Sequence, residues 1–263
     1  MKPIKSFLLI GCCFASLNIF AQSPRAIEAD LLKSLKRIDD AYQKADNDTT
    51  DNDRLADKIT TTNDAFAAKL LDYTAKYPST ISYPFLSLKK EHLNISTSAD
   101  GLFRIYSWDT ETGGTMHFFE NVFQYKQETK TLAVLDTPKT EGDNRPNYNK
   151  LYTFNANNKT YYLAAYLTIG STKDVGNGIQ IFSVESGKLN QDAKIIKTQS
   201  GMHSELRCDY NFFYVVNWKV RPSVYFNAAT KSIYVPLVDG NGRVTRKFIV
   251  YKFTGKYFEK VKS

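Results

Sequence analysis

Apolar residues in the first third of the chain recur at the spacing of an α-helix. Over residues 25–46 they are three or four positions apart, with charged residues between them: Ile27, Leu31, Leu35, Ile38 and Tyr42. The pattern returns over residues 53–77 at Leu55, Ile59, Phe66, Leu70, Tyr73 and Tyr77, and it stops at Pro78. Such spacing places one apolar stripe along each helix, and proline often follows a helix end. Because an Asp-rich polar stretch joins the two segments, residues 22–78 are predicted to form a helical hairpin.

From Thr80 onward the pattern changes to short aromatic and β-branched runs separated by Gly, Asn, Asp and Lys, which is typical of strands. The predicted strands are 80–88, 102–108, 115–125, 131–135, 150–155, 160–168, 178–184, 205–218, 223–226, 232–238 and 245–254. Asp239-Gly240-Asn241-Gly242 indicates a hairpin, because Gly and Asn adopt the positive φ of tight turns. The predicted fold class is α+β, with the N-terminal helical hairpin followed by an antiparallel all-β domain over residues 79–263.

One strand–turn–strand pattern occurs more than once in this region. Residues 154–162 (FNANNKTYY) are matched seventy-two positions later by residues 226–234 (FNAATKSIY), and each copy is followed by a long apolar run and a Gly-Lys turn. Residues 123–131 form a looser third copy. Repeated hairpins of this kind are typical of propeller blades or of a long meander. We therefore favour a propeller-like meander over a sandwich or a barrel, although hairpin turns also resemble one another by chance.

The first twenty-one residues have the pattern of a secretory signal peptide. Lys2 and Lys5 precede a short apolar run, and a small residue, Ala21, comes just before a polar break. The run is too short and interrupted for a bilayer-spanning helix. Residues 9–12 also fit a bacterial lipobox in which Cys12 would carry a lipid. The expected location is therefore the periplasm or the exterior, in soluble form or, as the less favoured alternative, anchored through Cys12.

Composition narrows the classes of partner. The chain has 35 basic and 27 acidic residues, a formal net charge of +8, and from Arg243 onward seven basic residues stand against one acid. A basic segment of this kind suits acidic polysaccharide or lipid headgroups, or it is the solvated face of edge strands. Export argues against nucleic acid as a partner. Cys208 is the one cysteine outside the first twenty-one residues, and strand alternation favours a buried core position for it.

The densest group of chemically capable residues lies between residues 98 and 117. Alternation places Arg104, Tyr106 and Trp108 on one strand face, beside a loop with Asp109 and Glu111; His117 is expected on the returning strand. Such a group suits a sugar or an anionic ligand, and paired carboxylates are what glycoside hydrolysis requires. The alternative is an ordinary hairpin with the tryptophan packed in the core. The predicted ligand-binding set is Arg104, Trp108, Asp109, Glu111, His117 and, from the polar loop 136–149, Arg145.

Two segments resemble stretches of uncharacterised exported β-rich proteins of Bacteroidota. They are the run from Arg104 to Asp109, followed by Gly113-Gly114-Thr115, and the run from Tyr251 to Glu259. The resemblance covers most of residues 80–263. It implies a bacterial envelope location and no particular activity.

Motifs for metal or cofactor chemistry do not emerge from the sequence. His92, His117 and His203 are scattered, without the paired spacing of zinc ligands, and no cofactor or metal is expected. The leading hypothesis is a non-catalytic binding protein whose partner is an envelope glycan or another envelope protein. The alternatives are a glycan-acting hydrolase using carboxylates of the 100–120 hairpin, and a periplasmic inhibitor or immunity protein. The oligomeric state is left open.

Overall fold

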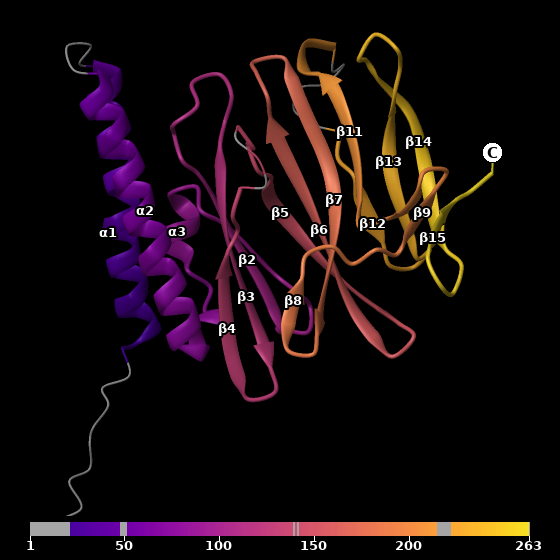
Figure 1. Cartoon of the computed structure of the whole chain (residues 1–263), viewed down its shortest axis with the longest axis horizontal. Coiled ribbons are helices and arrows are strands. Elements are labelled where there is room, and N and C mark those ends of the chain that lie inside the picture. Colours follow the sequence, from indigo (N-terminus) through magenta and orange to yellow (C-terminus); the bar gives the residue numbers. More distant parts are fainter. Residues whose placement is uncertain (1–21, 48–51, 139, 141, 215–221, 263) are drawn as a thin grey trace, which may run out of the picture.

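The computed structural model describes residues 22–47, 52–138, 140, 142–214 and 222–262. Two N-terminal helices are followed by three β-sheets, so the α+β class is confirmed (Figure 1). The predicted signal peptide and its Cys12 lie outside the described residues.

The helical segments in chain order are α1 (Pro24–Asn47), α2 (Asn52–Lys76), the 3-10 turn η1 (Pro78–Ile81), α3 (Leu86–Lys90) and the 3-10 turn η2 (Phe212–Tyr214). The strands are β1 (Asn94–Thr97), β2 (Phe103–Asp109), β3 (Phe119–Gln127), β4 (Lys130–Leu135), β5 (Asn147–Ala156), β6 (Lys159–Ile169), β7 (Asp174–Glu185), β8 (Lys188–Asn190), β9 (Ile196–Thr198), β10 (Gly201–His203), β11 (Glu205–Asn211), β12 (Tyr225–Asn227), β13 (Ser232–Val238), β14 (Val244–Phe253) and β15 (Phe258–Lys260).

The two long helices form where the apolar periodicity predicts them. Ser23 caps α1 by accepting a hydrogen bond from the Ala26 amide on its hydroxyl (3.2 Å), and Pro24 occupies the first helical position, where a missing N–H costs nothing. Side chains of the predicted stripe, including Ile27 and Leu31, are fully buried. Within the described part of the chain, no helix has the length and apolar character needed to cross a membrane.

The predicted strand at 80–88 is wrong, because this segment holds η1 and α3. Its apolar side chains are buried by packing rather than by strand pairing: Ile81, Phe85 and Leu88 are at most 1 % exposed. Pro78 begins the 3-10 turn, and Phe85 adopts a positive φ of 47°, so the backbone folds back on itself. Further along, the short strands β1, β8, β9, β10 and β15 fall outside the predicted ranges.

The strands form three open sheets. Sheet A has the order β1-β2-β3-β4, sheet B has β11-β7-β6-β5 with β8 beside β7, and sheet C has β10-β9-β15-β14-β13-β12. Neighbouring strands are antiparallel except for β15 and β9, which are parallel. Sheet C is therefore mixed, whereas sheets A and B are antiparallel.

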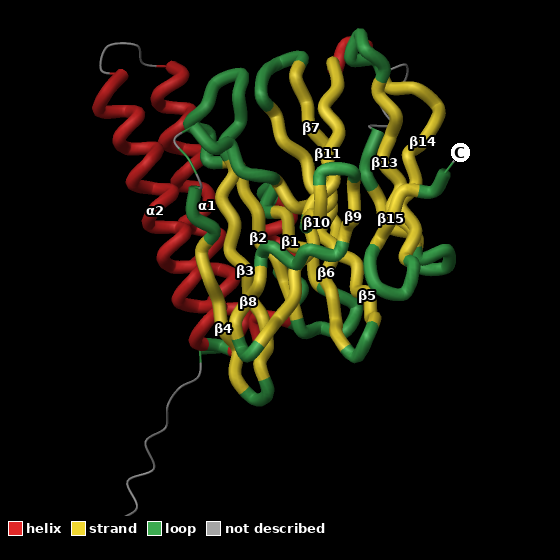
Figure 2. Tube along the Cα trace, turned by 45° about the vertical axis from the view of Figure 1, so that its right-hand side comes forward, coloured by secondary structure: helices red, strands yellow, loops and turns green. Residues whose placement is uncertain are grey.

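The layers follow one another as helices, sheet A, sheet B and sheet C (Figure 1). In Figure 2 both long helices lie on one side of the strands. One apolar cluster joins the helices to sheet A, a second joins sheet A to sheet B, and a third joins sheet B to sheet C. Both faces of sheets A and B are thus largely buried, whereas sheet C has an inner face against sheet B and an outer face.

The predicted hairpin repeat corresponds to equivalent positions in two sheets. The first copy is the β5–β6 hairpin of sheet B, and the second is the β12–β13 hairpin of sheet C. The Gly-Lys turns then connect β7 to β8 and β14 to β15, and Gly187 and Gly255 have positive φ values of 79° and 100°. The looser third copy is the β3–β4 hairpin of sheet A. The first two copies therefore occupy equivalent positions in sheets B and C, whereas the third is the last hairpin of sheet A.

Candidate functional site

Arg104 and Trp108 lie on the same face of β2, as alternation predicts, and the helices cover that face. Arg104 donates from Nη1 to the carbonyl oxygens of Thr80 (2.5 Å) and Tyr83 (2.7 Å). The Trp108 indole N–H donates to Asn63 Oδ1 (3.1 Å), and its ring is 1 % exposed. Both side chains therefore join the helical segments to sheet A, and their polar groups are bonded within the protein.

Asp109, Glu111 and His117 come together at one end of sheet A. The Asp109 carboxylate lies 2.5 Å from His117 Nδ1 through Oδ2 and accepts the Glu111 amide through Oδ1 (3.0 Å). His117 does not lie in the returning strand as predicted: it precedes β3 and bridges to Ile169, at the end of β6. Burial, with a further contribution from the Asp109 charge, raises the pKa of Glu111. The group sits at the rim between sheets A and B.

Arg145 lies in the predicted polar loop, next to the same rim. Its Nη1 donates to the Asp136 carbonyl (2.7 Å), and its Nη2 lies 3.5 Å from Glu120 Oε1. Only 11 % of its side chain is exposed. The loop carries Arg145 at a positive φ of 37°, stabilised by the Asp143 carboxylate, which accepts the Arg145 amide (3.1 Å). The loop thereby closes one side of a cleft.

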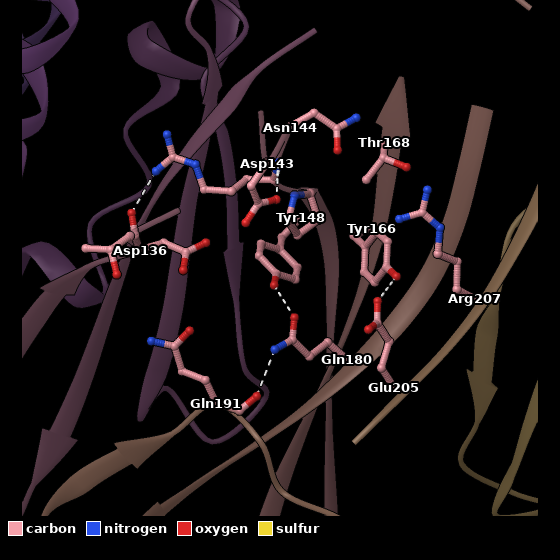
Figure 3. A pocket seen from close by; sticks show the side chains of 13 residues that line it. Asp136, Asp143, Asn144, Tyr148, Tyr166, Thr168, Gln180, Gln191, Glu205 and Arg207 are labelled. Atoms are coloured by element: carbon pink, nitrogen blue, oxygen red, sulfur yellow. Dashed lines mark hydrogen bonds between the residues drawn. The ribbon is translucent and has the colours of Figure 1, made fainter. Parts of the chain in front are cut away.

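This cleft opens between sheets A and B and has a volume of about 150 Å³ (Figure 3). Its walls come from the polar loop, from β5, β6, β7 and β11, and from the segment after β8. The lining residues are Asp136, Thr137, Asp143, Asn144, Arg145, Pro146, Tyr148, Tyr166, Thr168, Gln180, Gln191, Glu205 and Arg207. Nearly all of them carry hydrogen-bonding side chains. The cleft is therefore a polar site built from residues far apart in the sequence.

Two glycines of β7 shape the floor. A Cβ at Gly178 would lie 2.2 Å from Tyr166 Cζ, so the absence of a side chain lets the Tyr166 ring lie across the strand. A Cβ at Gly176 would meet Thr168 Oγ1 at 2.4 Å and Arg207 Nη2 at 2.7 Å. Glycine inside a strand often marks such a close approach. These positions are thus required by the side chains of the neighbouring strands β6 and β11.

Hydrogen bonds orient the groups on the floor. Tyr148 donates its hydroxyl to Gln180 Oε1 (2.5 Å), and Gln180 Nε2 donates to the Gln191 carbonyl (2.8 Å). Tyr166 donates to the Glu205 carboxylate, and the two phenol rings meet edge to face at 5.9 Å. Burial raises the pKa of Tyr148 and of Tyr166 well above the usual value for tyrosine. Both phenols therefore stay protonated and act as hydrogen-bond donors.

The wall of the cleft that β11 forms is charged, and it is more exposed to solvent than the floor. Arg207 donates from Nε to Asp209 Oδ1 (2.7 Å), and 43 % of its side chain is exposed. Glu205 and Arg207 face the cleft from the same side of β11, opposite Gln180 and Gly178 of β7. A bound molecule would meet an acid and a guanidinium on this wall, with the polar loop on the other side.

Of the residues predicted for binding, Arg145 lines the cleft, and His117 and Asp109 lie at the nearby rim. The sequence analysis missed Tyr166, Gln180, Glu205 and Arg207. A detectable signal was the pair Gly176 and Gly178 inside a strand, since such glycines often mark a close approach of neighbouring groups. Among the described residues, no group of three or more His, Cys, Asp or Glu is placed to hold a metal ion.

Cys208 lies next to Arg207 in β11 and points away from the cleft, into the core between sheets B and C. Burial raises the pKa of its thiol to about 11, which keeps it protonated. Its prediction as a core residue is confirmed.

Comparison with known proteins gives no function for the cleft. No model of a known protein family matches the chain, and no curated protein matches it either.

Proposed function

We propose that the protein is an exported, non-catalytic binding protein of the bacterial cell envelope that holds one unit of a glycan in the cleft between sheets A and B. The observation that carries the proposal is the lining of the cleft. Guanidinium, carboxylate, amide, hydroxyl and phenol groups from the polar loop and five other segments converge on one small volume.

A hydroxyl-rich ligand suits this lining better than an apolar one. Each sugar hydroxyl donates one hydrogen bond and accepts others, so it needs both kinds of partner in the protein. Arg207 supplies donors, Glu205 supplies an acceptor, and Gln180 supplies both. The tyrosine hydroxyls already donate to Gln180 and Glu205, so they offer a ligand acceptor lone pairs. Most small-molecule pockets are larger and mainly apolar, at roughly 300–1,000 Å³. The observed volume of about 150 Å³ fits a single sugar ring rather than a large cofactor.

The proposed location rests on the sequence. The charged, apolar and small-residue pattern of residues 1–21 supports export, and the resemblance to exported proteins of Bacteroidota supports an envelope setting. Glycans and envelope proteins are the partners available there. The engaged hydrogen bonds on the cleft floor favour binding over turnover, because Tyr148, Gln180 and Tyr166 already hold one another in place.

A hydrolase is the second candidate, and one observation favours it. Asp109 and Glu111 form a carboxylate pair at the rim, and Glu111 has a raised pKa, as a general acid requires. Asp109→Asn would then abolish turnover of a glycan substrate. Since Asp109 also bonds His117 and the Glu111 amide, melting temperature must be measured alongside, and a destabilised variant would indicate a structural role.

We also infer that the three layers are related as successive blades of a propeller-like array. Consecutive strands form the meanders β1–β4, β5–β8 and β12–β15, and the recurring hairpin occupies matching positions in the second and third. An experimental structure in which one rotation superposes sheet A on B and B on C would support this relation.

The binding proposal is tested by calorimetric titration with fragments of envelope glycans, peptidoglycan included, beside a thermal-shift screen. A ligand specific for the folded state stabilises it by about 2.7 kcal/mol at a hundred times its Kd. Arg207→Gln and Glu205→Gln should each weaken binding at least ten-fold. Lys188→Gln, an exposed cation on β8, is the matched control and should leave Kd unchanged.

A third variant tests the glycine floor. Gly178→Ala forces the Tyr166 ring to move, because the new methyl group would overlap it. We expect weaker binding from this variant even though no polar group is removed. Binding that survives all three substitutions would show that the cleft is not the site, and the absence of any glycan ligand would leave an envelope protein as the partner to seek.

A further inference from the structure

The outer face of sheet C carries an aromatic patch at the end of the stack. Tyr225 of β12 and Tyr234 of β13 stack with ring centroids 4.9 Å apart and planes at 3°. Phe248 of β14 packs edge to face against both, at 5.8 and 6.1 Å, and is 46 % exposed. Val250 lies opposite Tyr234 in the register. These four residues are called the outer patch below.

The outer patch differs from the inner face of the same strands. Alternation directs Ile233, Ile249 and Tyr251 toward sheet B, where they join the buried cluster. The outer patch points the other way, and Figure 1 shows sheet C as the terminal layer of the stack. A contiguous exposed apolar patch commonly marks an interaction surface.

Cations frame the outer patch along one strand. By alternation, Phe248, Val250 and Lys252 lie on one side of β14. Arg246 comes two residues before Phe248, within the irregular stretch of the strand where the register with β13 shifts. At about 3.4 Å per residue for an extended strand, Arg246 and Lys252 are at most about 20 Å apart. Both cationic residues are exposed.

The neighbouring strands add little negative charge. Glu259 of β15 lies opposite Lys252 and on the same face, and it is already paired with Lys197 of β9 at 3.1 Å. Lys197 also lies over the Tyr257 ring, 4.9 Å from its centroid. The described part of this face therefore presents aromatic rings with a surplus of positive charge.

We propose that the outer face of sheet C binds an acidic polysaccharide. The C–H faces of sugar rings would pack on the outer patch, and carboxylate groups along the polymer would pair with Arg246 and Lys252. Charge complementarity favours this occupant over a second copy of the chain, because two like-charged faces would meet in a symmetric pair. Basic residues before and after Phe248 and Val250 along β14 suit an extended polymer that follows the strand. This surface is separate from the cleft, and the proposal does not depend on it.

The test measures binding of the purified protein to alginate, a polymer of uronic acids, with neutral dextran as the uncharged comparison. The variants are Phe248→Ser, Arg246→Gln and Lys252→Gln, and the control is Lys90→Gln in α3, at the opposite end of the stack. Thermal melting first checks that each protein is fully folded at the assay temperature. We expect alginate to bind and dextran not to bind. We also expect each outer-face variant to weaken alginate binding at least ten-fold and the control to change it less than two-fold.

Several results would overturn the proposal. Failure to bind alginate would do so, as would alginate binding that Phe248→Ser leaves intact, since a mere attraction of opposite charges needs no aromatic ring. Vesicles with anionic headgroups that bind more tightly than alginate, with the same dependence on Phe248, would identify a membrane surface instead. Sedimentation that shows a dimer abolished by Phe248→Ser would identify a second copy.

Discussion

The two ends of the layered stack have similar aromatic sheet faces, but helices cover one face and leave the other exposed. At one end, the outer face of sheet A holds Tyr106 and Trp108, and the helical hairpin covers both completely. At the other end, the outer face of sheet C holds Tyr225, Tyr234 and Phe248, and the phenylalanine is 46 % exposed.

The difference shows that aromatic content alone does not decide whether a sheet face is core or surface. Sheet A gains a cover because two amphipathic helices precede it and carry matching apolar stripes. Sheet C has cations beside its aromatic residues, a combination that suits solvent and charged partners. The helical hairpin is thus a stabilising layer, and the outer face of sheet C is the surface that we propose for interaction.

Removing the central aromatic side chain of the covered face should have the largest effect. Trp108→Ala deletes a ring that packs edge to face on Phe66 at 5.0 Å and leaves the Asn63 carboxamide without its indole donor. We expect the free energy of unfolding to fall by about 3–5 kcal/mol. Chemical denaturation would measure this, and a loss below about 1 kcal/mol would contradict the view of the hairpin as a packed layer.

Arg104→Met should cause the second largest loss in the free energy of unfolding. The guanidinium donates to two backbone carbonyls of the segment between α2 and sheet A, and it also lies 5.7 Å from the centroid of the Phe85 ring. A buried polar group left without its partner costs about 1–3 kcal/mol. We expect a loss of about 2–3 kcal/mol, again from denaturation curves. A ligand-binding role for Arg104 predicts the reverse pattern, in which stability is kept and affinity is lost.

Asp30 of α1 should make a smaller contribution to the free energy of unfolding, and this contribution should depend on pH. The Tyr73 hydroxyl and Lys69 ammonium lower the pKa of Asp30 below its ordinary value of 3.8, and both partners lie on α2. Because the folded-state pKa is the lower one, this stabilisation is present above that ordinary value and is lost as the pH falls through the folded-state pKa.

Asp30→Asn should therefore destabilise the protein at pH 7, by less than about 1 kcal/mol because the pair is partly exposed. The difference from the parent should shrink in 1 M NaCl and vanish in acid below the folded-state pKa. Denaturation at pH 7 and in acid would check this. A deficit that persists unchanged in acid would show that the ion pair is not its source.

The open face should tolerate the loss of its most exposed ring. Phe248→Ala is expected to lower the free energy of unfolding by no more than about 0.5–1 kcal/mol, because the ring already meets solvent. The same denaturation experiment applies. A loss as large as that of Trp108→Ala would erase the contrast between the two ends and require an intramolecular cover for sheet C.

Sequence reasoning found the elements whose determinants are local. The spacing of Ile27, Leu31 and Leu35 specifies α1, and turn residues such as Gly187 specify hairpins through their positive φ. The strand prediction for residues 80–88 was wrong because a strand-like composition also suits a buried segment that forms a 3-10 turn and a short helix. What decides between them is the packing of Phe85 and Leu88 beneath the helices, which no local pattern encodes.

The candidate site was less accessible to such reasoning. Alternation correctly placed Arg104 and Trp108 on one face, but the residue that covers Trp108, Asn63, lies forty-five positions earlier in the chain. The cleft depends on the register of three strands, which sets Tyr166 opposite Gly178 and Gly178 opposite Arg207. Pairing of this kind follows from tertiary packing, so the residues could be recognised only once the sheet had been built.

The parallel pairing of β15 with β9 has a consequence for the order of folding. β15 lies between β14 and β9 in sheet C, and Phe258 pairs with Ile196 while its fully buried ring contacts Phe154, Phe226 and Phe253. Sheet C therefore cannot form by adding strands in chain order from β9 onward. The β9–β10 ribbon must await a segment some sixty residues later, and closing so long a loop is entropically costly and slow. Completion of sheet C is thus expected to be a late event in folding.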